Sequence, residues 1–220
     1  MSRRSELRRA VAGMAAVLAS WLLVPVPGAF AAPATIEQAA HTQSAAALPA
    51  ADTRTAAALP AAYRVNITMQ AQEKTNWCWA AAGNTIAAWH GVSVSQNHFC
   101  ALAKNRATSS ACPNDQAHLG EAQNALRKLN FTNPGQYLSN TLSYATIQQQ
   151  TAADQPVETR IGWQSGGGHM HVLYGYDTTK SWVYWGDPWQ SSSRYNWATY
   201  NYYRNNSSFT WTHTLTGIRR

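Results

Sequence analysis

The aromatic residues of this 220-residue chain are concentrated at one end, and this asymmetry constrains the fold more than any other feature. Residues 163–220 hold 6 of the 10 Trp and 7 of the 10 Tyr, in short runs separated by Gly, Asp, Asn and Ser. Such runs are typical of strands joined by turns. Residues 76–153 instead place apolar side chains at helical spacing. Helices followed by strands indicate an α+β domain with a helical lobe and an antiparallel β lobe, and a cleft between two lobes is the usual place for a site.

Four helices and five strands are expected from this patterning. In the first helix, an apolar stripe is formed by Trp79, Ala82, Ile86 and Trp89. The helices are expected at 76–90 (capped by Thr75 or Asn76), 95–104 (capped by Ser95), 116–129 and 141–153. The strands are expected at 63–70, 157–163, 169–176, 182–186 and 209–216.

The first 31 residues have the pattern of a cleavable secretory signal. Four arginines precede an apolar stretch over residues 10–26, and Ala29-Phe30-Ala31 supplies a small-x-small cleavage pattern. A transmembrane anchor is the alternative, but the stretch is short for one and contains Pro25. The mature protein is therefore expected to be secreted, extracellular and without integral membrane association.

The next segment, residues 32–62, is built mainly from Ala, Pro, Thr and Gln. It offers almost nothing large to bury, so we interpret it as an Ala/Pro-rich linker or a removable pro-segment. Aromatic and β-branched residues begin at Tyr63, which places one folded domain at 63–220.

Composition argues against two classes of protein. With 45% apolar and 12% charged residues, the chain is too apolar to be disordered. The formal net charge is +7, but the arginines of the predicted signal contribute part of it, and no dense Lys/Arg cluster follows them. Nucleic acid is therefore not an expected partner.

Three cysteines in an exported chain leave one unpaired. A polar loop separates Cys100 from Cys112 and allows them to close a disulfide, with two reduced, buried thiols as the alternative. Cys78 is then the unpaired thiol, in the first turn of the first expected helix. Free N–H groups and the helix dipole favour a thiolate there. Cys78 is therefore a candidate nucleophile, although a lone helical Cys is more often an apolar filler.

A nucleophilic cysteine needs a base, and His169 and His171 are placed to supply one. Both open an apolar strand directly after Gly166-Gly167-Gly168. The other five histidines lie in the linker, at helix ends or polar faces, or in the terminal strand. His171 sits deeper in its strand, so His169 is the preferred base and His171 the alternative.

Asp187 is the candidate that would orient the imidazole of His169. If residues 177–180 connect the two strands of the hairpin, His169 faces Pro188 and Asp187 faces Met170. The two side chains then lie at the same end of the hairpin but on opposite faces. A bulge, or the bend at Pro188, must shift one strand by a residue to bring them together.

Taken together, these residues resemble the motif of the papain-like cysteine proteases. Gln72 stands six residues before Cys78 in Q-x5-C-W-A, and a Gly-Tyr pair at Gly175 follows six residues after His169. An Asp then precedes a Trp at 187–189. The chain is most similar to small bacterial members, the bacteriocin-leader peptidases and the effector proteases of plant pathogens, which place Asp in the third position.

The resemblance implies a papain-like fold, with the Cys in the helical lobe and the His and Asp in the β lobe. Cys78 would attack the scissile carbonyl, His169 would hold its proton and Asp187 would orient the imidazole. The side chain of Gln72 and the backbone N–H of Cys78 would stabilise the oxyanion. Thr75 occupies the position of a disulfide cysteine in papain, so papain's substrate preferences are not carried over.

The leading hypothesis is an exported cysteine endopeptidase that acts on polypeptide substrates as a monomer and without a cofactor. One alternative keeps the machinery but acts as an amidase or acyltransferase on cell-wall or other amides. The other is a non-catalytic, aromatic-rich module that binds glycan or protein. A metal site is not expected, because His169-Met170-His171 lacks a convincing third ligand.

Overall fold

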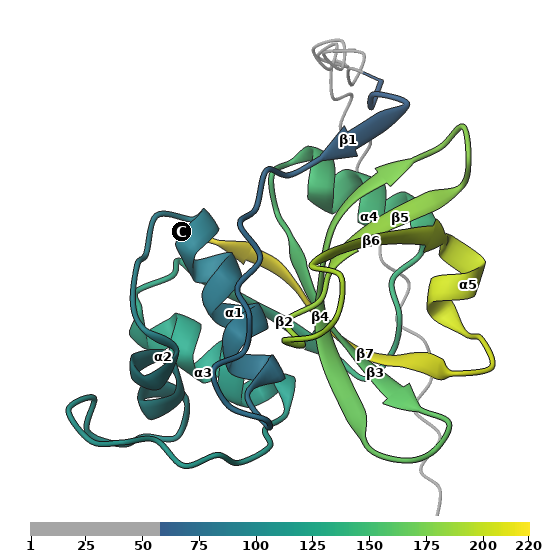
Figure 1. The fold of residues 1–220 in the computed structure, drawn as a ribbon. Coiled ribbons are helices and arrows are strands. Elements are labelled where there is room, and N and C mark those ends of the chain that lie inside the picture. The colour runs from purple at the N-terminus through teal and green to yellow at the C-terminus, as the bar shows by residue number, and fades with distance from the viewer. Residues whose placement is uncertain (1–57) are drawn as a thin grey trace, which may run out of the picture. The chain divides into compact units, whose positions relative to one another are not determined.

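The computed structural model describes residues 58–220. The predicted signal at 1–31, and the predicted linker as far as residue 57, lie outside the described residues. The described part consists of five helices and seven strands (Figure 1). None of these helices is long and apolar enough to cross a membrane.

Four helices precede most of the sheet, as expected, but two strands come earlier and a fifth helix lies between the last two strands. The helices are α1 (Cys78–Trp89), α2 (Gln96–Ala103), α3 (Leu119–Lys128), α4 (Tyr144–Ala152) and α5 (Tyr200–Arg204). The strands are β1 (Ala62–Arg64), β2 (Asn133–Leu138), β3 (Val157–Trp163), β4 (Gly168–Asp177), β5 (Trp182–Gly186), β6 (Tyr195–Thr199) and β7 (Phe209–Arg219).

All seven strands belong to one antiparallel sheet, in the order β2-β7-β3-β4-β5-β6, with β1 paired to β4. Helices α1, α2 and α3 lie together on one side of it (Figure 1). Alternate residues of β4 face two separate cores. Met170 and Val172 pack with α1 to α3, whereas Leu173 packs with residues of α4 and α5. The predicted α+β class is confirmed.

Helix α1 is enclosed on nearly every side. Its residues from Trp79 to Ala87 are all buried, so the predicted single apolar stripe is too narrow. The helix contacts α2 and α3 on one side and β3 and β4 on the other. Small side chains make this possible: a Cβ added to Gly83 would lie 2.6 Å from the ring of Phe99. The small Ala and Gly residues of α1 thus allow α2 and α3 on one side, and the sheet on the other, to pack closely against it.

The start of α1 differs from the expectation. The helix begins at Cys78 rather than at Asn76, and Trp77 precedes it without a side-chain capping bond. The predicted caps bind elsewhere, because Asn76 Nδ2 donates to the carbonyl of Asn114, and Asn114 Nδ2 donates to Thr75 Oγ1. The competing partner lies far along the chain, so local sequence could not reveal it.

The other helix starts depend on local caps. Ser95 accepts a hydrogen bond from the N–H of His98 at 3.1 Å, which confirms it as the cap of α2. Helix α3 begins at Leu119, three residues later than expected, because His118 and Glu121 form a capping box there.

The predicted strand at 63–70 is correct only at its start. Beyond β1 the chain stays extended and buries Val65, Ile67 and Met69 in alternation, but it joins no further ladder. It runs between the helices and the sheet, which explains the strand-like pattern without a strand. Ordered contacts also begin before the predicted boundary, since the carbonyl of Pro60 accepts a hydrogen bond from Tyr176 Oη at 2.7 Å.

Strands β3 and β5 have the predicted bounds, whereas β2, β6 and α5 were not expected. Asn133, Pro134 and Gly135 at the start of β2 have the composition of a turn. Proline is tolerated because β2 is an edge strand that pairs only with β7. The position of β2 at the edge of the sheet is what allows proline in this strand, and the local sequence does not reveal that position.

Candidate active site

A cleft of about 390 Å³ lies between the start of α1 and the β3–β4 connection. Its walls come from the segment entering α1, the segment before α3, the β3–β4 hairpin and the segment after β5. The lining residues are Thr75, Asn76, Cys78, Trp79, Gln116, Ala117, Arg160, Trp163, Gly168, His169, Met170, Asp187, Trp189 and Ser192.

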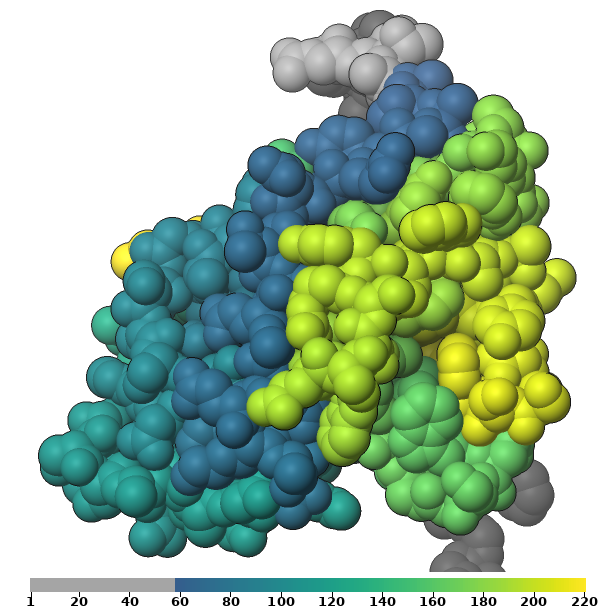
Figure 2. Space-filling view, in the orientation of Figure 1, coloured from purple at the N-terminus to yellow at the C-terminus, as the bar shows by residue number. Residues whose placement is uncertain are grey.

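The segment after β5 reaches across to the segment that leads into α1, as Figure 2 shows in yellow-green against blue. The N–H of Gln72 donates to the carbonyl of Pro188 at 2.8 Å, and Gln190 Nε2 donates to the carbonyl of Gln72 at 2.9 Å. These bonds tie the part of the chain that carries Asp187 to the part that carries Cys78.

Cys78 is the first residue of α1 and the one free cysteine in the described part of the chain. The backbone N–H groups of Cys78, Trp79 and Ala80 have no acceptor among residues 58–220. Because Trp77 supplies no side-chain cap, the positive end of the helix dipole is left open beside the thiol. This arrangement favours negative charge on an oxygen bound next to the sulfur.

The turn of the β4–β5 hairpin is one residue later than predicted. Asp177 pairs with Trp182, so the connection is 178–181 rather than 177–180. The predicted pairing of His169 with Pro188 is therefore wrong.

A one-residue irregularity in the hairpin, between Leu173 and Gly175, corrects the geometry that the sequence left unsolved. The extra residue in β4 reverses which residues of the two strands share a face. As a result His169 and Asp187 lie on the same face at the open end of the hairpin, and a bulge of this kind is what the sequence required.

His169 and Asp187 are directly hydrogen-bonded. His169 Nε2 lies 2.7 Å from Asp187 Oδ1, and the same oxygen accepts the N–H of Trp189 at 2.8 Å. Cys78 and His169 line the same cleft. With Nε2 committed to the carboxylate, Nδ1 is the nitrogen left for the thiol.

The electrostatics of this group favour a charged imidazole. Burial lowers the pKa of His169, but its hydrogen bonds to Asp187 and Cys78 outweigh burial and raise the pKa to about 9. Burial also raises the pKa of Asp187, yet the hydrogen bond from His169, the charge of His169 and the hydrogen bond from the N–H of Trp189 hold that pKa below its ordinary value. At neutral pH the pair is therefore an imidazolium and a carboxylate.

Two tryptophans hold the ring of His169. Trp163 stacks on it with ring centroids 6.1 Å apart, and Trp189 meets it edge-on at 6.2 Å. Both indoles are partly exposed at the cleft. Trp163 was not among the predicted site residues, and its place at the end of β3 before a glycine-rich turn was the available signal.

His171 does not line the cleft. It is buried, with Nδ1 3.2 Å from Tyr203 Oη and Nε2 3.8 Å from Asp187 Oδ2. Burial and the charge of His169 lower its pKa to about 3, so His171 stays neutral. His171 thus lies beside the Asp187 carboxylate within the protein interior, whereas His169 lines the cleft.

The fold supplies the third potential metal ligand that the sequence did not reveal. Ligand atoms of His169, His171 and Asp187 all lie within 4.8 Å of one another. A cation held by all three would have to replace the hydrogen bond between His169 and Asp187, because both would turn their lone pairs to the metal. The cluster is therefore arranged for proton handling.

Gln72 is the predicted site residue that the structure does not bring to the others. It is 1% exposed, does not line the cleft, and directs Nε2 to the carbonyls of Lys74 and Thr75 at 2.8 Å each. Both N–H groups of the amide are thus used on the turn that precedes Cys78. The oxyanion-donor role implied by the resemblance does not fit this orientation.

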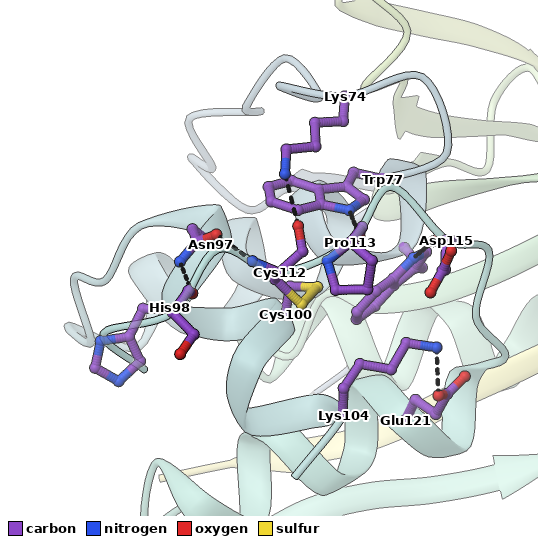
Figure 3. The surroundings of a disulfide bond; sticks show 12 residues. Lys74, Trp77, Asn97, His98, Cys100, Lys104, Cys112, Pro113, Asp115 and Glu121 are labelled. Carbon is purple, nitrogen blue, oxygen red and sulfur yellow. Dashed lines mark hydrogen bonds and ion pairs between the residues drawn. A yellow bond between two sulfur atoms is a disulfide. The ribbon is translucent and has the colours of Figure 1, made fainter. Parts of the chain in front are cut away.

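A disulfide between Cys100 and Cys112 stabilises the other side of that turn (Figure 3). It fixes residue 112 to helix α2 across a separation of 12 residues. From there Lys74 Nζ donates to the carbonyl of Cys112 at 2.6 Å, and Trp77 Nε1 donates to the carbonyl of Pro113 at 2.8 Å. The disulfide therefore anchors a segment that contacts the entry to α1.

The same segment makes further bonds to the start of α1. The N–H of Asn76 donates to Asn114 Oδ1 at 2.9 Å, and Trp79 Nε1 donates to the carbonyl of Asp115 at 3.1 Å. Residues 112–115 thus hold the residues on both sides of Cys78. The position of the thiol depends on contacts that the disulfide maintains.

We expect the double variant Cys100→Ala/Cys112→Ala to lose activity as well as stability. Its free energy of unfolding should fall by about 3 kcal/mol, the cost expected for a loop of this size. Its kcat/KM should fall further than that of Ile147→Ala, a matched destabilising change in the core beneath α4, away from the cleft. Equal kcat/KM in the two folded variants would show that the disulfide does not position the thiol.

Comparison with known proteins agrees with this geometry. Residues 61–207 match the family of the papain-like cysteine protease AvrRpt2. The chain belongs to this family. It is therefore a papain-like cysteine peptidase, and the matched range contains Cys78, His169 and Asp187. No curated protein matches the chain significantly.

The fold of this family member is shared with a solved peptidase domain. The peptidase domain of Streptococcus ComA, a bifunctional ABC transporter involved in quorum sensing, is 16% identical, with a TM-score of 0.51 over 72% of this chain and 99% of that domain. Xylellain, a cysteine protease from Xylella fastidiosa, is 13% identical, with a TM-score of 0.47 over 74% of this chain and 88% of its own. At this identity, the likeness concerns the fold alone.

Proposed function

We propose that this protein is an exported cysteine endopeptidase that uses Cys78 as nucleophile, His169 as base and Asp187 as the group that orients the base. The observation that carries the proposal is that the His169 imidazole is hydrogen-bonded to a carboxylate and lines the same cleft as the free thiol at the start of α1. Each part matches a need of acyl transfer through a thiolate.

The proposed reaction begins with the Cys78 thiolate and the His169 imidazolium. The sulfur adds to the scissile carbonyl, and the imidazolium gives its proton to the leaving amine as the C–N bond breaks. Water then attacks the thioester and passes a proton to His169. The C–S bond breaks, which releases the acid and restores the thiolate–imidazolium pair. Asp187 stays hydrogen-bonded to Nε2 of His169 throughout the reaction. Nδ1 of His169 is therefore the nitrogen that accepts and releases the proton.

The oxyanion donor in this proposal is the backbone N–H of Cys78. That group has no acceptor among the described residues and stands at the open N-terminus of α1. Gln72 is assigned a positioning role instead, because its amide already donates to the carbonyls of Lys74 and Thr75.

We expect Gln72→Ala to lower stability and activity together. Loss of both hydrogen bonds to the turn should reduce the free energy of unfolding by about 1–3 kcal/mol, and kcat/KM should fall because Cys78 loses its fixed approach. Urea unfolding and steady-state kinetics measure the two effects. A direct oxyanion donor would behave differently, with kcat lower by about 10²–10³ and unfolding unchanged.

The raised pKa of His169 predicts an alkaline limit to activity. The ion pair needs the proton on His169, so kcat/KM should fall as the pH rises through about 9. Asp187→Asn removes the negative charge that raises this pKa, so the limit should move to lower pH. A pH profile of both proteins tests this, and an unchanged limit in Asp187→Asn would contradict it.

Export is supported by the sequence pattern of residues 1–31 and by the disulfide between Cys100 and Cys112, a bond that persists in oxidising compartments. Expression of the full chain, followed by N-terminal sequencing of the released protein, tests this part. Cleavage after residue 31 supports it, and a full-length protein retained in the cell contradicts it.

The enzymatic proposal is tested by casein digestion with and without a thiol-directed epoxide. We expect proteolysis that the epoxide abolishes, with the label mapped to Cys78 by peptide mass spectrometry. Labelling without hydrolysis of casein or of any peptide would favour the amidase or acyltransferase alternative. Absence of labelling at Cys78 would contradict both enzymatic interpretations.

A further inference from the structure

Arg160 is the ionisable residue of the cleft to which the proposed mechanism gives no role. It lies on β3 opposite Met170, the residue that follows His169. It is half-buried and lines the same cavity as Cys78. A peptide that reaches the thiol therefore passes beside this side chain.

The fold makes room for the guanidinium at the start of β4. A Cβ added to Gly168 would lie 2.6 Å from Nη2 of Arg160, closer than real contacts allow. Arg160 Nη1 also donates to Thr212 Oγ1 at 2.9 Å. The arginine is thus packed over a glycine and held by a threonine, and a side chain at position 168 would displace it.

The positive charge of Arg160 has no carboxylate partner within the described residues. None of their ion pairs includes it. Glu158 lies on the same face of β3, but its carboxyl oxygens are buried without a hydrogen-bond partner, so it does not bind the guanidinium. The Asp187 carboxylate is bound by His169 and by the N–H of Trp189.

A guanidinium carries five N–H donors in a planar fork, and Thr212 takes one of them. The remaining fork matches the two oxygens of a carboxylate better than any neutral group. A carboxylate partner, which residues 58–220 do not supply, would reach the guanidinium through the cleft.

We infer that Arg160 is a specificity residue that binds a substrate carboxylate beside the scissile bond. This inference rests on the proposed function and names the substrate class of that same site. The carboxylate comes from an acidic side chain of the substrate or from its C-terminus, and the two sources share the chemistry but differ in which peptides are cleaved.

The test uses a casein-derived peptide, centred on a bond cleaved in the casein digest if there is one and on its middle bond otherwise. Matched peptides carry Glu or Gln at each position flanking this bond, and each is made with a free or an amidated C-terminus. For the wild-type enzyme we expect kcat/KM to favour the carboxylate by about tenfold or more at one position. A preference that depends on the side chain identifies an acidic residue, and one that depends on the terminus identifies the chain end.

Variants assign this preference to Arg160. In Arg160→Gln the ratio of kcat/KM between the Glu and Gln peptides should fall to about one, and Arg160→Glu should favour Lys at the same position. Arg204→Gln, a change of equal charge in α5 outside the cleft, should keep the wild-type ratio. A wild-type enzyme without any carboxylate preference, or an Arg160→Gln variant that keeps it, overturns the inference.

Binding to the Cys78→Ala variant separates this inference from the proposed function. The Glu peptide should bind about tenfold or more tightly than the Gln peptide, and the difference should disappear in Cys78→Ala/Arg160→Gln. Tight, carboxylate-dependent binding without cleavage by the wild type would count against the peptidase proposal and still support the role of Arg160. Cleavage by the wild type, together with equal binding of the Glu and Gln peptides, would support the peptidase proposal and count against the role of Arg160.

Discussion

We expect Cys78→Ser to retain the fold and to lose peptide hydrolysis by at least about 10³-fold. The hydroxyl of serine does not ionise in the range where the thiol does, so the imidazolium of His169 has no thiolate to pair with. The measurement is kcat/KM on a casein-derived peptide, with circular dichroism and urea unfolding to show that the variant is folded.

Selective labelling is the matched control for this variant. Iodoacetamide should modify Cys78 in the wild type, whereas Cys100 and Cys112 are joined in a buried disulfide and should not react. The Cys78→Ser protein should take up no label unless it is first reduced and unfolded. Full activity of this variant, or equal labelling of all three cysteines, would end the cysteine-peptidase mechanism proposed for this site.

The second large effect is expected from His169→Ala, which should lower kcat/KM by about 10³-fold or more. The imidazole is hydrogen-bonded to Asp187 and lines the same cleft as Cys78, so its loss removes the proton carrier and the ion pair together. Addition of free imidazole to the variant should restore part of the activity if the missing function is proton transfer.

His171→Ala is the matched comparison for His169→Ala. His171 is buried against Tyr203 and stays neutral, so its loss should reduce the free energy of unfolding by about 2–4 kcal/mol while kcat/KM stays within about tenfold of the wild type. If His171→Ala is inactive and folded while His169→Ala is active, the base has been assigned to the wrong histidine.

The sequence was sufficient where the determining signal is local. Ser95 caps α2 because its partner, the N–H of His98, is three residues away. Strands β3 and β5 have the predicted bounds because runs of apolar and aromatic residues end at turn residues. The prediction failed for β2, where a proline is tolerated because the strand lies at an edge.

The β4–β5 hairpin shows how much of the site can be predicted from residue spacing alone. The sequence put His169 and Asp187 at one end of two adjacent strands and required a shift by one residue to bring them to a common face. It did not show where the shift occurs. The irregularity between Leu173 and Gly175 lies where β4 also begins to pair with β1, a strand that is far away in the sequence.

The sequence by itself determined which residues can do chemistry: a thiol at a helix start, two histidines after three glycines, and an aspartate before a tryptophan. Only the tertiary structure decided how they are used. Asn114 forms hydrogen bonds with the side chains of Thr75 and Asn76, so neither of them caps α1. The amide of Gln72 donates to the carbonyls of Lys74 and Thr75 and does not line the cleft. A side chain's direction follows from competition among partners that are distant in the sequence and adjacent only once the chain has folded.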